Sequence, residues 1–206
     1  MFFDSHAHYN DDRFDIDRHN LLSDMPQNGV DYIVNAGGDI GTSIEGIKLA
    51  KQYPFFYAAV GVHPHEVGDT PEDTIDTLRK LANHKKVLAI GEIGLDYYYE
   101  HSPRQIQRVW FKYQMELAQE LDLPIIVNSR EAAQETFDMI KESGNQKGVI
   151  HCFSGSAELA LEYVKLGFYI GVGGTVTFAN ARKIVEVVEK TPLSSIVIET
   201  DCPYIA

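Results

Sequence analysis

Two histidines near the start of the chain are the first residues whose type and spacing indicate chemistry. His6 and His8 lie two residues apart in the apolar and aromatic segment 2–8. If this segment is a strand, side chains two residues apart point to one face, so both imidazoles converge with Asp4 on one side. The pair is either part of a metal site or a chance occurrence on an exposed strand edge.

Three further side chains of the metal-binding types end apolar runs elsewhere in the chain. Glu92 follows the run 87–91, His151 follows 149–150, and Asp201 closes the run that begins near residue 195. Taken singly, Glu92 could form a salt bridge and His151 could be an ordinary core histidine. Together with His6 and His8 they supply imidazole and carboxylate ligands, a combination that suits Zn²⁺, Mn²⁺ or a similar divalent ion.

Such a site requires elements that bring these distant residues to one edge. Nearly continuous apolar runs alternate with longer segments that are each wide enough for a helix, as expected for parallel strands covered by helices. This pattern predicts the α/β class and a closed TIM (β/α)₈ barrel, whose sites lie at the carboxyl ends of the strands; an open sheet of six or seven strands is the alternative. The expected strands are residues 2–8, 32–36, 56–62, 87–93, 124–128, 149–153, 168–173 and 195–200.

Four of the intervening segments carry helical patterns. The clearest covers residues 104–121 after Pro103, and another covers 156–166, with a serine at its start and Gly167 after its end. Segments 131–142 and 179–190 are similar but weaker. The helix expected at 104–121 has one apolar stripe, formed by Ile106, Val109, Trp110, Tyr113 and Leu117.

The organisation predicts a single domain over residues 1–206. A closed barrel normally ends with a helix over its last strand, and here only six residues follow the strand expected at 195–200. We therefore expect the chain to be a C-terminally truncated part of a longer protein.

The composition limits the classes of partner that the chain is expected to bind. The formal net charge is −12 and no basic stripe is visible, so a polyanion must be drawn in locally by metal ions and a few cations. This favours small phosphoesters or strand ends over long double helix. No apolar run is long enough to cross a bilayer, and no secretion signal begins the chain, so we expect no membrane partner. Two cysteines fit a reducing cytoplasm without a disulfide-linked partner.

The cysteines and the glycine-rich segments have simpler interpretations. Cys152 follows His151 directly, so a cysteine nucleophile must be considered, but strand alternation is expected to turn it away from the site as a buried wall residue. Cys202 has the same relation to Asp201. Segments 36–38 and 171–174 match no phosphate-binding loop and are expected to be tight turns after strands.

Several motifs in order resemble the TatD-like hydrolases, a family of metal-dependent deoxyribonucleases in the wider amidohydrolase-like group. The resemblance covers the whole chain and is carried by FDSHAH at 3–8, GVHPH at 61–65, GEIGLDY at 91–97, HCFSG at 151–155 and ETDCPY at 199–204. It implies a TIM-type barrel that binds one or two divalent ions (Mg²⁺, Mn²⁺ or Zn²⁺).

The resemblance also implies roles for individual residues. His6, His8 and Asp201 would hold one ion, Glu92 would bridge, and His151 would help to hold a second. Among the remaining positions, His63 and Arg130 would line the substrate site, with Asp96 supporting its loop. His63 could instead be a structural cap of its own loop.

Two departures from the family pattern bear on these roles. Asn128 stands where the family has histidine before Ser-Arg, and an amide oxygen is a weaker ligand than imidazole for a borderline-soft ion. The second ion is therefore bound weakly or is a harder ion such as Mg²⁺ or Mn²⁺. The second departure is that this sequence lacks the C-terminal segment in which the family has its last helix and a loop near the site.

The expected reaction is hydrolysis of a phosphodiester at the 3′ end of single-stranded DNA by a metal-activated water. Asp201 would act as general base, and Glu92 would share the catalytic centre. An amidohydrolase acting on a cyclic amide, lactone or ester is the first alternative, although Glu92 occupies the place of a bridging lysine. A non-catalytic metal-binding homologue is the second.

Overall fold

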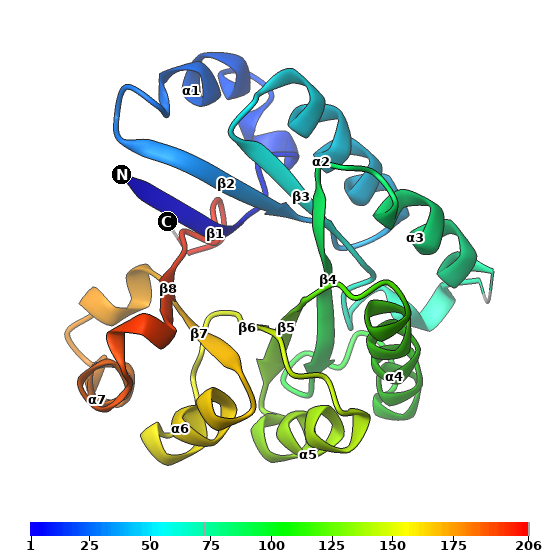
Figure 1. Cartoon of the computed structure of the whole chain (residues 1–206), viewed down its shortest axis with the longest axis vertical. Coiled ribbons are helices and arrows are strands. Elements are labelled where there is room, and N and C mark those ends of the chain that lie inside the picture. The colour runs from blue at the N-terminus through cyan, green and yellow to red at the C-terminus, as the bar shows by residue number, and fades with distance from the viewer. Residues whose placement is uncertain (72, 206) are drawn as a thin grey trace.

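The fold is an eight-stranded parallel barrel surrounded by helices, as Figure 1 shows looking down it. It is seen in a computed structural model that describes residues 1–71 and 73–205. All seven ladders between neighbouring strands are parallel and run in sequence order. The strands are β1 Phe2–Ala7, β2 Val30–Ala36, β3 Phe56–Val60, β4 Val87–Asp96, β5 Ile125–Arg130, β6 Gly148–Ile150, β7 Phe168–Val172 and β8 Ile196–Ile198.

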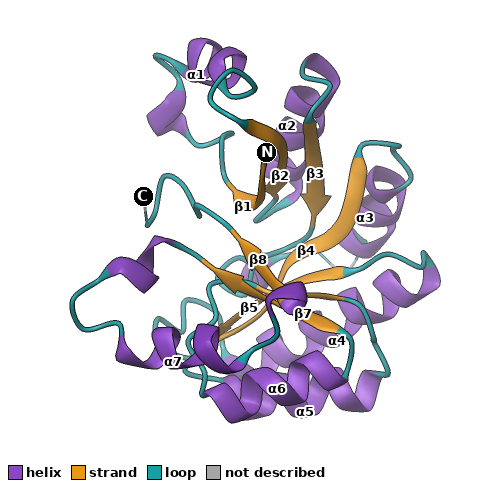
Figure 2. Cartoon of the chain, turned by 60° about the vertical axis from the view of Figure 1, so that its left-hand side comes forward, coloured by secondary structure: helices purple, strands orange, loops and turns teal. Residues whose placement is uncertain are grey.

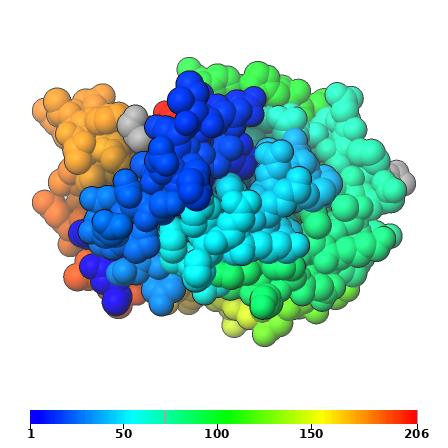
Figure 3. All heavy atoms as spheres, turned by 90° about the horizontal axis from the view of Figure 1, so that it is seen from above, coloured from blue at the N-terminus to red at the C-terminus, as the bar shows by residue number. Residues whose placement is uncertain are grey.

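The barrel closes where β1 meets the segment that follows β8. The Asp201 N–H donates to the His6 carbonyl at 2.9 Å, and the His8 N–H donates to the Cys202 carbonyl at 2.8 Å. Figure 1 accordingly shows β1 and β8 as neighbours, and blue N-terminal atoms lie beside orange and red atoms of the C-terminal part in Figure 3. The predicted barrel is thus confirmed in place of the open sheet.

The helices form an outer layer around the strands, which converge at the centre of Figure 2. Each of the seven intervals between strands contains one α-helix within the described residues, as the spacing predicts. They are α1 Arg18–Asp24, α2 Ile40–Gln52, α3 Thr74–Ala82, α4 Arg104–Glu120, α5 Ala133–Ser143, α6 Ala157–Lys165 and α7 Arg182–Lys190. None of the helices in this part of the chain has the length and apolarity that crossing a membrane requires.

Local sequence signals explain where several helices begin and end. The Ser156 hydroxyl accepts a hydrogen bond from the Leu159 N–H and caps α6, while Gly167 adopts a φ of 94° just after it. Asp39 forms a capping box with Thr42 at the start of α2, directly after the glycines at 37–38. The predicted serine cap and the tight turn after β2 are therefore confirmed.

The buried face of α4 differs from the predicted stripe. Trp110 and Leu117 are buried as expected, but Ile106 and Tyr113 are exposed. The helix is rotated so that Gln107 and Gln114 face the barrel, because both amides bind backbone groups at strand ends. A pattern of apolar residues alone could not anticipate buried glutamines.

Apolar side chains fill both faces of the barrel wall. Val60, Ile90 and Val127 belong to the large core that the strands share with the helices. Strand alternation therefore turns residues such as Ala59 and Ile126 into the barrel, where they form a small separate cluster. Beyond this apolar interior, buried polar side chains such as His6, Glu92 and His151 lie toward the carboxyl ends of the strands.

Candidate metal centre

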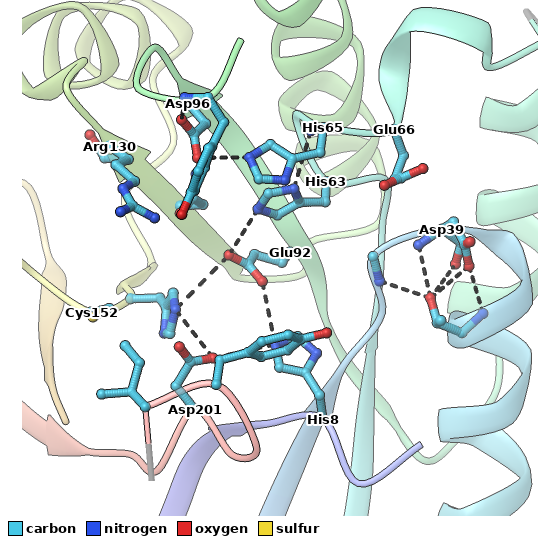
Figure 4. Close-up of a pocket in the computed structure, with 18 of the residues that line it drawn as sticks. His8, Asp39, His63, His65, Glu66, Glu92, Asp96, Arg130, Cys152 and Asp201 are labelled. Carbon is cyan, nitrogen blue, oxygen red and sulfur yellow. Dashed lines mark hydrogen bonds and ion pairs between the residues drawn. The ribbon is translucent and has the colours of Figure 1, made fainter. Parts of the chain in front are cut away.

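The imidazoles of His6 and His8 converge with two carboxylates at the carboxyl end of the barrel. The Nε2 atoms of the two histidines lie 3.0 Å apart. They lie 3.3 and 3.7 Å from one Glu92 oxygen, and 3.8 and 3.4 Å from the Asp201 Oδ1 atom. Of this predicted group, Figure 4 labels His8, Glu92 and Asp201, with Glu92 at the centre of the view.

Glu92 faces two groups of histidines with its two oxygens. Oε2 faces His6 and His8, whereas Oε1 lies 3.5 Å from His63 Nε2 and 4.0 Å from His151 Nε2. Burial by itself would raise the pKa of Glu92, but the neighbouring histidines outweigh it and hold this pKa well below its ordinary value. The residue is therefore an anion placed between two sets of nitrogen donors.

His151 is oriented by a residue that the sequence analysis did not single out. Its Nδ1 atom lies 3.2 Å from the buried Glu199 carboxylate, whose other oxygen accepts a hydrogen bond from the Cys152 N–H at 2.6 Å. Burial lowers the pKa of His151, but the carboxylates of Glu199, Glu92 and Asp201 outweigh burial and raise it to about 10. The sequence signal that could have identified Glu199 is a carboxylate inside the expected strand 195–200, two residues before Asp201.

Gly171 of β7 makes room for this carboxylate. A Cβ atom at that position would lie 2.6 Å from Glu199 Oε2, closer than side chains tolerate. The glycine predicted to form a turn thus lies inside β7 and admits the group that orients His151.

Asp201 and Asp4 have different surroundings although both are buried. Asp201 adopts a left-handed backbone with a φ of 51° immediately after the strand region, which brings its carboxylate to the histidines. Asp4 instead accepts hydrogen bonds from the Thr200 N–H and hydroxyl at 3.0 and 2.7 Å, and burial raises its pKa to about 6. Asp4 therefore fixes the junction between β1 and the β8 segment and does not join the donor cluster.

The donor set fits a divalent cation. Burial lowers the pKa of His6 below its ordinary value, and that of His63 to about 4, so both imidazoles are neutral and can offer a lone pair at neutral pH. Ligand atoms lie within 4.8 Å of one another in the triads His6–Glu92–His151 and His6–His8–Asp201. Converging nitrogens and carboxylate oxygens are the donors that Zn²⁺ and Mn²⁺ prefer.

A cavity of about 780 Å³ opens over these groups and includes the remaining predicted site residues. His63, Asp96, Asn128 and Arg130 all line it. Asn128 is half-buried, and its amide nitrogen donates to the Leu95 carbonyl at 3.1 Å. The cavity size is typical of a small-molecule site.

Asp96 organises one wall of this cavity with His65. Its Oδ2 atom lies 2.8 Å from His65 Nε2, and its Oδ1 atom accepts hydrogen bonds from the Tyr98 and Tyr99 N–H groups. Burial raises the pKa of Asp96, but these partners outweigh it and lower the pKa overall. His65 was not singled out from the sequence, although it lies in the quoted motif at 61–65.

Cys152 corrects one expectation. It is half-buried and lines the same cavity, whereas strand alternation predicted that it would point away. The reason is that β6 ends at Ile150 and Cys152 has a φ of 43°, so the alternation of a strand does not extend to it. Burial and the nearby Glu199 charge raise its pKa to about 12, which keeps the thiol protonated and agrees with a non-nucleophilic role.

Comparisons with known proteins agree with this geometry. Residues 3–206 match the family model described as TatD related DNase. The chain is 42% identical to an uncharacterized metal-dependent hydrolase, YabD, of Bacillus subtilis, covering all of this chain and 81% of that protein. It is 32% identical to the 3′-5′ ssDNA/RNA exonuclease TatD of Salmonella typhimurium, covering 98% of this chain and 79% of that one.

A solved structure shares the fold. The TatD homologue YjjV of Escherichia coli superimposes with a TM-score of 0.93 at 34% identity, over 99% of this chain and 80% of that chain.

Proposed function

Since the chain belongs to the TatD-related DNase family of metal-dependent hydrolases, we propose that it hydrolyses phosphodiester bonds at the 3′ end of single-stranded DNA. The observation that carries the proposal is the convergence of imidazole and carboxylate groups from separate strands beneath a cavity. The exonuclease activity in the name of the Salmonella relative supports this choice of substrate. Small phosphoesters would fit the same chemistry.

We assign the donor groups to one or two divalent ions. His6, His8 and Asp201 would hold the first ion, and Glu92 would bridge with its second oxygen toward His151. Asn128, which lines the same cavity, would complete the second site. A bound divalent ion would lower the pKa of water from about 15.7 toward 7 and offset charge on the phosphoryl oxygens. Asn128 supplies a weaker donor than histidine, which favours Mg²⁺ or Mn²⁺ in the second site.

Two residues of the chain carry the proposed proton and charge chemistry. Asp201 would accept the proton of the attacking water, with its backbone fixed by the hydrogen bond to the His6 carbonyl. Glu92 would supply negative charge between the two histidine groups, because these histidines hold its pKa well below the ordinary value.

The substrate phosphate would be held by groups in the cavity wall. Arg130 would donate to the non-bridging oxygens, and neutral His63 would form a hydrogen bond to an oxygen without adding charge. Among the described residues that line the cavity, Arg130 is the single lysine or arginine. It therefore offers a permanent positive charge there for a phosphate.

The test compares metal content and release of mononucleotides from 3′- and 5′-labelled single-stranded DNA with Mg²⁺, Mn²⁺ or Zn²⁺. We expect the 3′ label to be released first, and Asp201→Asn to lose about a hundredfold or more in kcat. The exposed Asp138→Asn change is the matched control and should have no effect. Asn128→His should strengthen binding of the second ion.

Three outcomes would contradict the proposal. If the wild-type chain and Asn128→His both bind metal but release no nucleotide with any of these ions, the nuclease assignment is wrong. Hydrolysis of a dihydropyrimidine-type cyclic amide in place of DNA would identify an amidohydrolase. Bound metal without hydrolysis of either substrate would identify a non-catalytic homologue.

A further inference from the structure

Arg130 is held at the rim of the cavity by its backbone. It is the last residue of β5 and pairs with Asp96 of β4, and its carbonyl accepts a hydrogen bond from the Tyr97 N–H at 2.9 Å. The extension of β4 to Asp96 thus places Arg130 beside the turn that contains Tyr98 and Tyr99.

The carboxylate of Asp96, which pairs with Arg130 in the ladder between β4 and β5, already has other partners. Asp96 Oδ1 accepts two backbone N–H groups, and Asp96 Oδ2 lies 2.8 Å from His65. Within the part of the chain that the structure describes, Arg130 has no carboxylate partner and its side chain donates no hydrogen bond. No carboxylate among these residues therefore pairs with its positive charge.

Two tyrosine rings hold the guanidinium instead. Its central carbon lies 4.4 Å from the ring centre of Tyr98 and 4.6 Å from that of Tyr99, and the two rings meet edge to face at 86°. Both rings are largely exposed, at 60% and 50%. A cation over an aromatic face is attracted by the ring quadrupole, and this contact does not use the N–H donors in the guanidinium plane.

Arg13 shows the contrasting arrangement on the other side of the site. It lies 4.5 Å over the Tyr204 ring, but its N–H groups also bind both oxygens of Asp11. The same type of aromatic contact thus accompanies a neutralised arginine there and an unneutralised one at the cavity.

We propose that Tyr98 and Tyr99 are positioning residues that hold Arg130 at the cavity with its donors free to bind a phosphate group of the substrate strand. This inference rests on the proposed function for the identity of the phosphate. In a chain of net charge −12, a carboxylate partner would have cancelled the attraction that the phosphate needs. An aromatic partner fixes the arginine without that cancellation.

The first measurement needs no hydrolysis. Metal-loaded protein is titrated with inorganic phosphate while the Arg130 Nε–H signal, assigned with Arg130→Gln, is followed by NMR. The Tyr98→Leu/Tyr99→Leu double variant should bind phosphate about five- to thirtyfold more weakly, from two cation–π contacts of roughly 0.5–1 kcal/mol each. Tyr98→Phe/Tyr99→Phe keeps both rings and should stay within about twofold of wild type.

The second measurement is the kinetics on a single-stranded oligonucleotide. The leucine double variant should raise KM by the same factor and leave kcat and metal content within about twofold. In the Arg130→Gln background the leucine changes should add nothing, because their effect acts through the arginine. Tyr113→Leu, on α4 at 47% exposure, is the matched control and should leave KM and kcat unchanged.

The outcomes separate this inference from the proposed function. If the chain hydrolyses DNA but the leucine variant equals wild type, or the phenylalanine variant loses as much as the leucine variant, the positioning role is wrong. An equal loss in the Arg130→Gln background would also overturn it. If the wild type hydrolyses no nucleic acid while its phosphate response still depends on the two rings, the proposed function fails and the positioning role stands.

Discussion

Glu199 lies behind His151 and acts on the candidate metal centre only through that histidine. A carboxylate on the far nitrogen of a metal-binding imidazole fixes the ring and raises its basicity, and such partners contribute about ten- to hundredfold in metal affinity. We therefore expect Glu199→Gln to weaken binding of the ion nearest His151 by about that factor. Competition with a chelating dye measures this affinity.

The matched control for Glu199→Gln is Glu158→Gln. Glu158 is exposed on α6 and lies 3.8 Å from Lys190, so its change should leave the metal affinity as it is. An unchanged affinity in Glu199→Gln would show that Glu199 does not support a metal ligand.

At this scale, residue type and strand-end position were enough to predict the cluster of His6, His8, Glu92, His151 and Asp201. They were not enough for Glu199 or Cys152, whose places depend on where β6 and β8 end and on the left-handed backbone at Cys152. Such backbone turns depend on tertiary contacts and leave no periodic pattern in the sequence.

Among the elements, α4 contributes more than apolar packing. Gln107 binds the Asp96 N–H and carbonyl at 2.8 and 3.0 Å, and also the Ser102 carbonyl. Seven residues later on the same face, Gln114 binds the Val62 N–H and carbonyl in the same way. One helix thus satisfies the backbone at the end of β4 and of the chain just after β3, where the cavity wall begins.

The buried amide of Gln107 should therefore support stability and the site together. Gln107→Ala leaves backbone groups of Asp96 and Ser102 buried without partners, and each such group costs about 1–3 kcal/mol. We expect the free energy of unfolding in urea to fall by about 3 kcal/mol, with a higher KM because the turn carrying Tyr98 and Tyr99 loosens. Gln105→Ala, exposed on the same helix, should stay within about 0.5 kcal/mol, and equal losses in both variants would refute this role.

The order and type of the elements were predictable, because apolar runs of strand length alternate with longer segments throughout. The residues at which the strands and helices end were harder to predict. The extension of β4 from the expected residue 93 to Asp96 depends on pairing with β5, and the rotation of α4 depends on the two glutamines. Both are long-range contacts that propensity does not encode.

For the whole molecule, the important feature is the seam where the barrel closes. The seam is held by hydrogen bonds between the end of β1 and residues 198–202, including those from Thr200 to the Asp4 carboxylate. The proposed ligands of the first ion lie on both sides of the seam, with His6 on β1, His8 directly after β1 and Asp201 after β8. A bound ion would therefore join the first and last parts of the barrel.

Removal of the metal should accordingly loosen the seam before the rest of the barrel. An ion present at about 100 times its Kd stabilises the closed seam by about 2.7 kcal/mol. With a chelator we expect the amides of Asp201 and His8, which bridge the seam, to exchange with deuterium about a hundredfold faster. Amides in the ladder between β2 and β3 should change far less, because neither of these strands carries a proposed ligand. Asp201→Asn with metal present should resemble the chelated wild type at the seam. An equal acceleration at the seam and in the β2–β3 ladder would mean that the ion stabilises the fold as a whole. No acceleration would mean that the hydrogen bonds close the barrel without the ion.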